Sequence, residues 1–348
     1  MNPSPFLGVF LHSIGGFAAG SFYIPFRKVR KWAWESYWLM QGVLAWIIMP
    51  WLIAWLTTPR LLSVLSHSPS GSIEWAFLFG ALWGIGGLTF GLSMRYLGMS
   101  LGYAMSLGFT AVFGTLVPPI FHGKFIPMAH TASGQAVLAG VVVCVIGIAV
   151  CALAGIHKER ELTTEEKQST IEEFDLVKGF LVAAFAGVMS ACMAFGIDAG
   201  KPIAHTALLA GTDSVYQNNS VFVPIMAGGF LTNLIWCGIL NIKNKTAGDY
   251  LTGKGGQLAA NYFFAGLAGI IWFGQFFFYG MGTTKMGRYN FSSWSIHMAF
   301  IIVFSNLWGL FFHEWKGVRP VTRKLIWSGI AVLIFSTIVI GFGNYLAA

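Results

Sequence analysis

The composition of this 348-residue chain excludes an ordinary water-soluble protein, because 56% of its residues are hydrophobic and only 10% are charged. Soluble domains have roughly 25% charged residues, and a chain of this length has too little interior to hide so much apolar surface from water. We therefore predict a membrane protein, with the lipid bilayer as its main partner. The formal net charge of +8 comes from basic residues placed in loops, so we expect no nucleic-acid partner.

Ten apolar segments follow one another along the chain, each close to the ~20 residues that a helix needs to cross the hydrocarbon core. They are predicted at residues 6–26, 37–56, 75–94, 100–121, 135–155, 179–199, 219–241, 257–281, 290–312 and 325–346. The strands of a membrane β-barrel alternate apolar and polar residues over about ten positions, and these segments do not. The sequence therefore predicts ten transmembrane helices.

The basic residues are divided unevenly between the two sides of these ten segments. Of the 21 Lys and Arg residues, 16 fall in the loops on one side and five in the loops on the other, which is also the side of both termini. Basic loops remain in the cytoplasm during membrane insertion. We therefore expect both termini on the outer side of the membrane.

One long charged stretch, His157–Asp175, lies at the middle of the chain and separates five apolar segments from five more. An odd number of crossings per half turns the second half upside down in the bilayer, which is typical of inverted-repeat secondary transporters. We predict a first five-helix repeat at residues 1–156, a charged cytoplasmic linker at 157–176 and a second five-helix repeat at 177–348. The predicted fold is thus all-α, with ten transmembrane helices in two inverted five-helix repeats.

Ionisable side chains within a membrane segment are costly and therefore mark candidate functional sites. His12 in the first segment and His297 in the ninth are two such residues, and histidine is the side chain that gains and loses a proton near neutral pH. Each is a candidate for proton coupling, with a hydrogen-bonded packing role as the alternative. Asp198 stands three residues before Lys201, and the two form either a gate or proton site or an ion pair at a helix end.

The eighth segment presents the clearest pattern for a sugar site. Trp272, Gln275, Phe276 and Tyr279 follow the i, i+3, i+4, i+7 spacing of one helical face. Aromatic rings cover the C–H faces of a sugar, while an amide and a phenol bind its hydroxyl groups. The alternative is a face that packs against a neighbouring helix. Amides inside the predicted segments include Gln41, Asn233, Gln275 and Asn306.

Other polar and aromatic residues lie near segment ends. Tyr289 and Trp294 fall roughly on the same side of the ninth segment as His297. Arg95 closes the third segment and either orients a sugar hydroxyl or anchors the helix at the inner interface. Glu35 follows a tryptophan, a pair that predicts an interface anchor with the ring at the headgroups and the carboxylate in water.

The sequence has no HExxH and no Walker loop, and its one G-x-S-x-G match, at residues 98–102, runs into a predicted transmembrane segment and does not follow a strand. We therefore expect no catalytic activity, no metal and no cofactor, and we expect energy from an ion gradient in place of ATP. Glycines spaced four apart, such as Gly16 and Gly20 or Gly80 and Gly84, predict helices that pack closely through their backbones.

Five stretches of the sequence resemble, in the same order, those of bacterial L-rhamnose–proton symporters. They are residues 25–35 (PFRKVRKWAWE), 77–86 (FLFGALWGIG), 94–100 (MRYLGMS), 275–279 (QFFFY) and 314–316 (EWK). The resemblance covers nearly the whole chain and implies membership of the drug/metabolite transporter superfamily, whose ten helices form two inverted five-helix repeats. The residues that match the family pattern are His12, Trp83, Arg95, Gln275, Tyr279, Tyr289, Trp294 and His297. The sequence departs from the pattern at residues 87–90 and at Asp198, where an amide is expected, and these departures bear on which sugar is preferred.

The resemblance implies a proton-coupled importer of L-rhamnose, or of a close 6-deoxy sugar, in the bacterial cytoplasmic (inner) membrane. In that membrane the distribution of basic residues predicts that both termini are periplasmic. Transport is expected to proceed by alternating access, with H+ as the coupling ion. The expected substrate-binding residues are Trp83, Trp272, Gln275, Phe276, Tyr279, Tyr289 and Trp294, with His12, His297 and Asp198 as proton-coupling candidates and Arg95 beside them. The alternative is an exporter or exchanger of another small polar metabolite. Short loops and missing motifs argue against a sugar sensor or an intramembrane enzyme.

Overall fold

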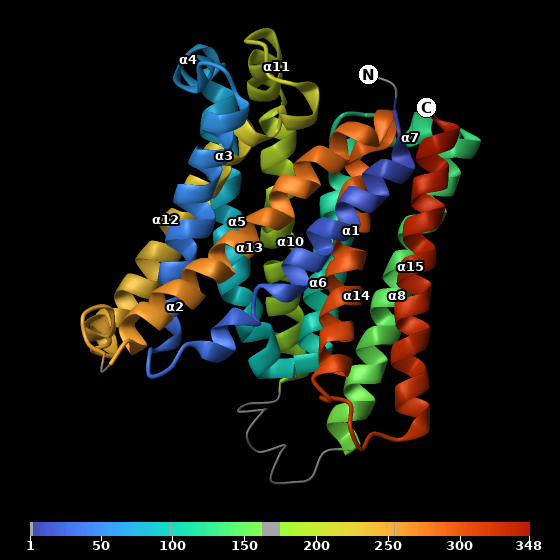
Figure 1. The fold of residues 1–348 in the computed structure, drawn as a ribbon. Helices are drawn as coiled ribbons and strands as arrows, with labels where there is room; N and C mark the ends of the chain where they lie inside the picture. Colours follow the sequence, from blue (N-terminus) through green and yellow to red (C-terminus); the bar gives the residue numbers. More distant parts are fainter. Residues whose placement is uncertain (1–2, 98, 162–174, 254) are drawn as a thin grey trace.

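The computed structural model describes residues 3–97, 99–161, 175–253 and 255–348, and within these ranges it contains helices and no strand (Figure 1). Nine helical segments are long and apolar enough to cross a membrane, and a shorter apolar stretch covers Met105–Phe121. The prediction of an all-α membrane protein is therefore confirmed for the described part of the chain.

Nine long α-helices account for most of the bundle. They are α1 (Pro5–Ser21), α5 (Ser70–Leu97), α6 (Met99–Phe121), α8 (Ala132–Glu161), α10 (Leu176–Ala199), α12 (Asn219–Lys243), α13 (Gln257–Lys285), α14 (Ser293–Phe311) and α15 (Pro320–Leu346). The second crossing is composite and consists of α2 (Trp34–Gly42), the π-helical turn η2 (Val43–Ile48) and α3 (Met49–Thr57). The short elements are α4 (Leu61–His67), α7 (Phe125–Ala129), α11 (Lys201–Leu209), η1 (Pro25–Lys28), η3 (Ser214–Tyr216), η4 (Ala247–Tyr250) and η5 (Gly287–Ser292). Each of the ten predicted segments overlaps one long or composite helix.

The composite second crossing changes its helix type around Pro50. A proline inside a helix lacks the backbone N–H, and its ring clashes with the carbonyl group four residues earlier, which here belongs to Trp46. The backbone N–H of Met49 donates to the carbonyl oxygen of Leu44, five residues earlier. One wide turn therefore relieves the clash, and the helix continues beyond it as α3.

The framework of the bundle rests on a few extended helix pairs. α8 lies along α15, α5 packs against α10 and α12, α6 packs against α10, and α1 packs against α13 and α14. In Figure 1, α8 and α15 form one edge of the bundle, and α2, α3 and α12 lie toward the opposite edge. Both termini lie at the same end as α4, α7 and α11. Of the predicted linker, residues 162–174 lie outside the described residues.

Glycine lets several of these helices touch through their backbones. A Cβ atom built on Gly80 of α5 would lie 2.0 Å from the carbonyl oxygen of Ile225 on α12, and one built on Gly228 of α12 would lie 2.0 Å from the carbonyl oxygen of Phe77. On α1, a Cβ atom at Gly16 would lie 2.3 Å from the Cβ atom of a phenylalanine on α14. No side chain fits at such distances, so the close packing predicted from the glycine spacing is confirmed at Gly16 and Gly80.

Candidate functional site

The aromatic face predicted on α13 is buried inside the bundle. Trp272, Phe276 and Tyr279 are 7%, 4% and 3% exposed. The ring centroids of Trp272 and Phe276 lie 5.1 Å apart, and those of Phe276 and Tyr279 lie 6.5 Å apart. Gln275 is buried on the same helix. The helical spacing therefore produces a continuous column of rings along α13.

Two further indoles meet this column at Trp272. The ring centroid of Trp272 lies 5.6 Å from that of Trp83 on α5 and 5.5 Å from that of Trp46 on η2, and the centroids of Trp46 and Trp83 lie 6.2 Å apart. We call these three residues the tryptophan cluster. The sequence predicted Trp83 and Trp272 for the site but missed Trp46, which is one of 14 tryptophans in the chain.

Two histidines flank the other end of the column. The ring centroid of Tyr279 lies 5.2 Å from that of His12 on α1 and 5.1 Å from that of His297 on α14, and the two imidazole centroids lie 6.3 Å apart. We call these three residues the histidine–tyrosine cluster. Both imidazoles are fully buried, and none of their four ring nitrogens has a hydrogen-bond partner among the residues that the structure describes.

Glycines position this cluster. A Cβ atom built on Gly282 of α13 would lie 2.8 Å from Cε1 of His12, and one built on Gly15 of α1 would lie 2.8 Å from the carbonyl oxygen of Gln275. The missing side chains let α1 approach α13 until the imidazole of His12 rests against the backbone of the neighbouring helix. His12, a proton-coupling candidate from the sequence, is thus placed beside Tyr279.

Trp294 borders the same cluster but has a structural partner. Its ring centroid lies 6.4 Å from that of His297 and 5.7 Å from that of Tyr279. Its indole N–H donates to the carbonyl oxygen of Thr110 on α6, 3.0 Å away. The indole therefore packs against Tyr279 and His297, while its only hydrogen-bond donor is used between α14 and α6.

A cavity connects the histidine–tyrosine cluster with the end of the bundle that holds both termini. We call it the vestibule. Its volume is about 340 Å³, and its walls include Tyr279 and Thr283 of α13, Asp198 of α10 and Lys201 of α11. A neighbouring cavity of about 440 Å³ shares Asp198 and Lys201 with it and extends to Tyr289. Tyr279 is thus the residue that both lines the vestibule and contacts the two histidines.

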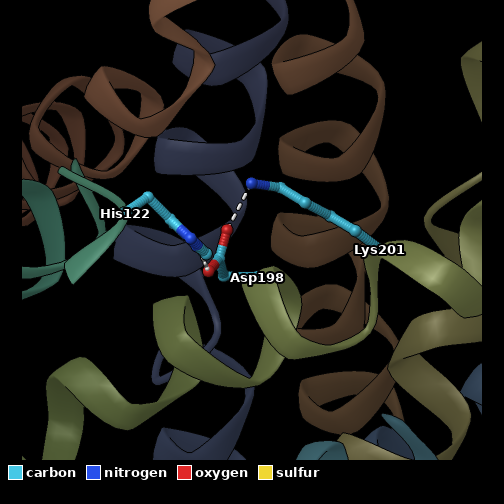
Figure 2. A network of polar contacts seen from close by, with 3 residues as sticks. All are labelled: His122, Asp198 and Lys201. Atoms are coloured by element: carbon cyan, nitrogen blue, oxygen red, sulfur yellow. Dashed lines mark hydrogen bonds and ion pairs between the residues drawn. The ribbon is translucent and has the colours of Figure 1, made fainter. Parts of the chain in front are cut away.

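The mouth of the vestibule carries a charged network, shown in Figure 2. One oxygen of Asp198 lies 2.5 Å from Nε2 of His122, in the turn that follows α6, and the other accepts a hydrogen bond from the ammonium group of Lys201. The predicted ion pair of Asp198 and Lys201 is confirmed, while His122 was missed. Both carboxylate oxygens of Asp198 therefore have partners, unlike the ring nitrogens of the two buried histidines.

Tyr289, another predicted site residue, does not join the column of rings. The hydroxyl group of Tyr289 lies 3.0 Å from Oγ1 of Thr131 and 3.3 Å from Oγ of Ser133, so it ties η5 to the start of α8. Arg95 belongs to α5, but its side chain lies outside the described part of the structure, and its predicted role stays a prediction.

A second polar network lies at the end of the bundle opposite the termini. It shows that the expectation for Glu35 was wrong. The carboxylate of Glu35 does not lie in water, because the residue is only 5% exposed and accepts hydrogen bonds from Asn244 Nδ2 at 3.0 Å and Thr246 Oγ1 at 2.8 Å. Nearby, Asp249 accepts hydrogen bonds from the Ala33 backbone N–H and the Ser36 hydroxyl, both at 2.8 Å. These contacts fasten the start of α2 to the connection between α12 and α13.

Comparison with known proteins identifies the family. The sequence profile described as L-rhamnose-proton symport protein (RhaT) matches residues 1–346. A protein of Klebsiella pneumoniae (strain 342) named L-rhamnose-proton symporter is 38% identical over 349 residues, which cover 99% of each chain. A protein of the same name from Yersinia pestis (strain Pestoides F) is 37% identical over 347 residues, again covering 99% of each chain. The chain therefore belongs to the L-rhamnose-proton symport protein (RhaT) family.

Proposed function

We propose that this protein imports L-rhamnose, or a close 6-deoxy sugar, together with protons across the bacterial inner membrane. The observation that carries the proposal is the histidine–tyrosine cluster, where two imidazoles without partners among the described residues lie beside a phenol that lines the vestibule. Buried polar groups in folded proteins almost always have hydrogen-bond partners. Polar groups kept without them at the end of an open cavity are suited to bind a substrate and a proton.

The chemistry of the column fits a deoxy sugar. Ring faces of Phe276 and Tyr279 cover C–H groups, and the methyl group of a 6-deoxy sugar gains more from such contacts than a hydroxymethyl group would. The phenol of Tyr279 and the nitrogens of His12 and His297 supply donors and acceptors for the ring hydroxyls. A neutral sugar also needs no counter-charge, which agrees with the position of the charged residues at the mouth.

His12 and His297 are suited to hold one proton at a time. Their ring centroids lie 6.3 Å apart, and two positive charges at such a separation repel each other strongly at the low effective dielectric constant of a protein interior. A proton from the vestibule reaches them past Tyr279. Each proton that moves down 100 mV of membrane potential releases about 2.3 kcal/mol, which is the energy available for sugar accumulation.

The packing of the helices supports an inverted repeat of residues 1–156 and 177–348. In an inverted repeat, α1 corresponds to α10, α5 to α13, α6 to α14 and α8 to α15. Under this correspondence the α5–α10 contact becomes the α13–α1 contact. The α6–α10 contact becomes the α14–α1 contact, and the α8–α15 contact maps onto itself. This is the arrangement implied by the drug/metabolite transporter superfamily. The excess of basic residues at the opposite end supports periplasmic termini.

In this orientation the vestibule opens to the periplasm, and the path toward the cytoplasm is closed. The tryptophan cluster and the contacts of Glu35 with Asn244 and Thr246 lie on the closed side. We assign Asp198 to the mouth, where it joins the turn after α6 to α11, and not to proton transfer, because both of its oxygens have partners. Alternating access then requires the hydrogen bonds of Glu35 to break and the mouth of the vestibule to close.

Uptake of labelled L-rhamnose into proteoliposomes tests the proposal. We expect accumulation when the outside is made acidic, and its collapse when a protonophore is added. A panel of neutral hexoses, 6-deoxy hexoses and small organic acids identifies the preferred substrate under the same gradient. Folded protein that accumulates none of the 6-deoxy sugars would contradict the proposed substrate, and accumulation that ignores the protonophore would contradict proton coupling.

A further inference from the structure

A second set of buried polar groups without partners lies at the tryptophan cluster. Gln41 of α2 is 0% exposed and Trp46 is 2% exposed, and neither the amide atoms of Gln41 nor the indole N–H of Trp46 has a partner within the described ranges. A nearby amide behaves in the usual way, since Asn233 accepts from the indole of Trp38 at 3.0 Å and donates to the Gly229 carbonyl oxygen at 2.9 Å. The difference singles out Gln41 and Trp46.

The π-helical turn places these two residues against the column of rings. The indole of Trp46 folds back over Gly42, where a Cβ atom would lie 2.6 Å from its ring. The backbone of Gln41 touches α13 at Gly269, where a Cβ atom would lie 2.5 Å from the Gln41 carbonyl oxygen. Gly269 lies three residues before Trp272 on α13, so the backbone of Gln41 contacts α13 about one turn from the tryptophan cluster, to which Trp46 belongs. Wide turns of this kind are frequent at functional sites.

We propose that Gln41 and the indole N–H of Trp46 bind sugar hydroxyls at an inner subsite, with the ring faces of Trp83 and Trp272 against the C–H groups of the sugar. An amide offers two donors and an acceptor, and an indole offers one donor, which together match two or three neighbouring hydroxyls. The inference rests on the proposed function, because it names a further residue pair for the same substrate.

The inner subsite is separate from the histidine–tyrosine cluster. Trp272 and Tyr279 are seven residues apart on α13, which corresponds to about 10 Å along a helix and exceeds the width of one pyranose ring. A single sugar therefore contacts one end of the column at a time. It binds beside the histidines when the vestibule is open and at Gln41 after the mouth has closed.

Gln41→Met distinguishes a binding role from a structural one. Methionine keeps the length and approximate volume of glutamine but removes its polar atoms. Because these atoms have no partner in the described structure, the substitution removes the penalty of burying them unpaired. We expect the melting temperature of the sugar-free protein to rise by a few degrees while sugar binding weakens. A purely structural role predicts a lower melting temperature and unchanged binding.

The experiment uses the full-length protein in liposomes loaded with L-rhamnose and measures counterflow of the labelled sugar, which needs no proton gradient and samples both orientations of the site. We expect the half-saturating concentration to rise about tenfold in Gln41→Met and about threefold in Trp46→Phe, as expected for lost neutral hydrogen bonds. Gln135→Met is the matched control, since Gln135 on α8 donates to the Ala129 carbonyl oxygen away from the column.

The outcomes distinguish failure of the inner subsite from failure of the proposed function. Gln41→Asn keeps the amide but shortens its reach by one methylene, and it replaces Gln41→Met if the latter does not fold. If half-saturation is unchanged in Trp46→Phe and in the Gln41 variant, the inner subsite is overturned while the proposed function stands. If the wild-type protein gives no counterflow of L-rhamnose, the proposed substrate fails and the inner subsite for it fails as well.

Discussion

The charged network at the mouth of the vestibule and the histidine pair behind it differ in whether their polar atoms have hydrogen-bond partners. Asp198 has a partner for each carboxylate oxygen, His122 on one and Lys201 on the other (Figure 2). His12 and His297 lie deeper, fully buried, and none of their ring nitrogens is paired within the described structure. Satisfied polar groups stabilise an arrangement, whereas unsatisfied ones lower stability and are available to a ligand.

The largest expected effect is the loss of coupling in His297→Gln. One proton moving down ~150 mV supports a sugar gradient of roughly 300-fold at most, and we expect the gradient to fall to about 1 in this variant. Counterflow of L-rhamnose without a proton gradient should persist. The melting temperature should not fall, because the imidazole has no hydrogen bond to lose within the described structure. A variant that still accumulates sugar would remove His297 from the coupling step.

Tyr279→Phe tests whether the hydroxyl group of Tyr279 binds the sugar at the point where the vestibule meets the two histidines. The substitution removes one hydroxyl from the residue that lines the cavity and contacts both imidazoles. We expect the half-saturating concentration for uptake to rise about fivefold, as for one lost hydrogen bond, with little change in melting temperature. Tyr345→Phe is the control, because Tyr345 is 56% exposed near the end of α15. Equal effects in the two variants would contradict a binding role for Tyr279.

Asp198→Asn should produce the reverse pattern. Removing the charge weakens the contacts with His122 and Lys201, both of which are partly exposed, so the expected loss is about 1 kcal/mol or less. Thermal unfolding and the steady-state sugar gradient are measured on the same preparation. We expect a melting temperature lower by a few degrees and an unchanged gradient. A collapsed gradient with unchanged melting would place Asp198 in the proton path.

The smallest effect concerns a satisfied carboxylate far from the column. Glu161 accepts hydrogen bonds from the Thr322 hydroxyl and the Arg319 backbone N–H, both at 2.6 Å. These two bonds lower the pKa of the Glu161 carboxyl below the ordinary value for glutamate. A lowered folded-state pKa stabilises the protein above the unfolded-state pKa, and this contribution is lost as pH falls through the folded-state value.

Melting curves of the wild-type protein and Glu161→Gln between pH 3 and pH 7 check this expectation. The wild type should melt slightly higher near neutral pH, and the difference should shrink as the pH falls and the carboxyl becomes protonated. Sugar uptake should be the same in both proteins. A difference that grows toward acid would contradict the hydrogen-bonded carboxylate at the start of α15.

Local sequence patterns were enough to predict the helices and the buried aromatic face of α13. Hydropathy and length placed ten apolar segments, each of which overlaps a long or composite helix, because lipid demands long apolar helices. The i, i+3, i+4, i+7 spacing gave Trp272, Phe276 and Tyr279 a shared face, and the structure shows that face buried. Each of these features depends on residues within a few turns of one another.

Features that depend on distant partners were missed. Glu35 was expected in water, but its partners Asn244 and Thr246 lie more than 200 residues away in the sequence. Trp46 carries no signal of its own in so aromatic a chain, and its place at the site follows from the turn before Pro50. Tyr289 falls near His297 in the helical pattern, yet η5 is a 3-10 turn with its own direction and takes Tyr289 to α8.

The glycine contact between α5 and α12 also bears on which parts of the protein move as one piece. α5 comes from the first half of the chain and α12 from the second, yet a methyl group at Gly80 or at Gly228 would lie 2.0 Å from a carbonyl oxygen of the other helix. Helices in such intimate contact cannot slide past each other without losing the dispersion attraction that holds them. We therefore expect α5 and α12 to move as one unit during transport, although they come from different halves of the chain.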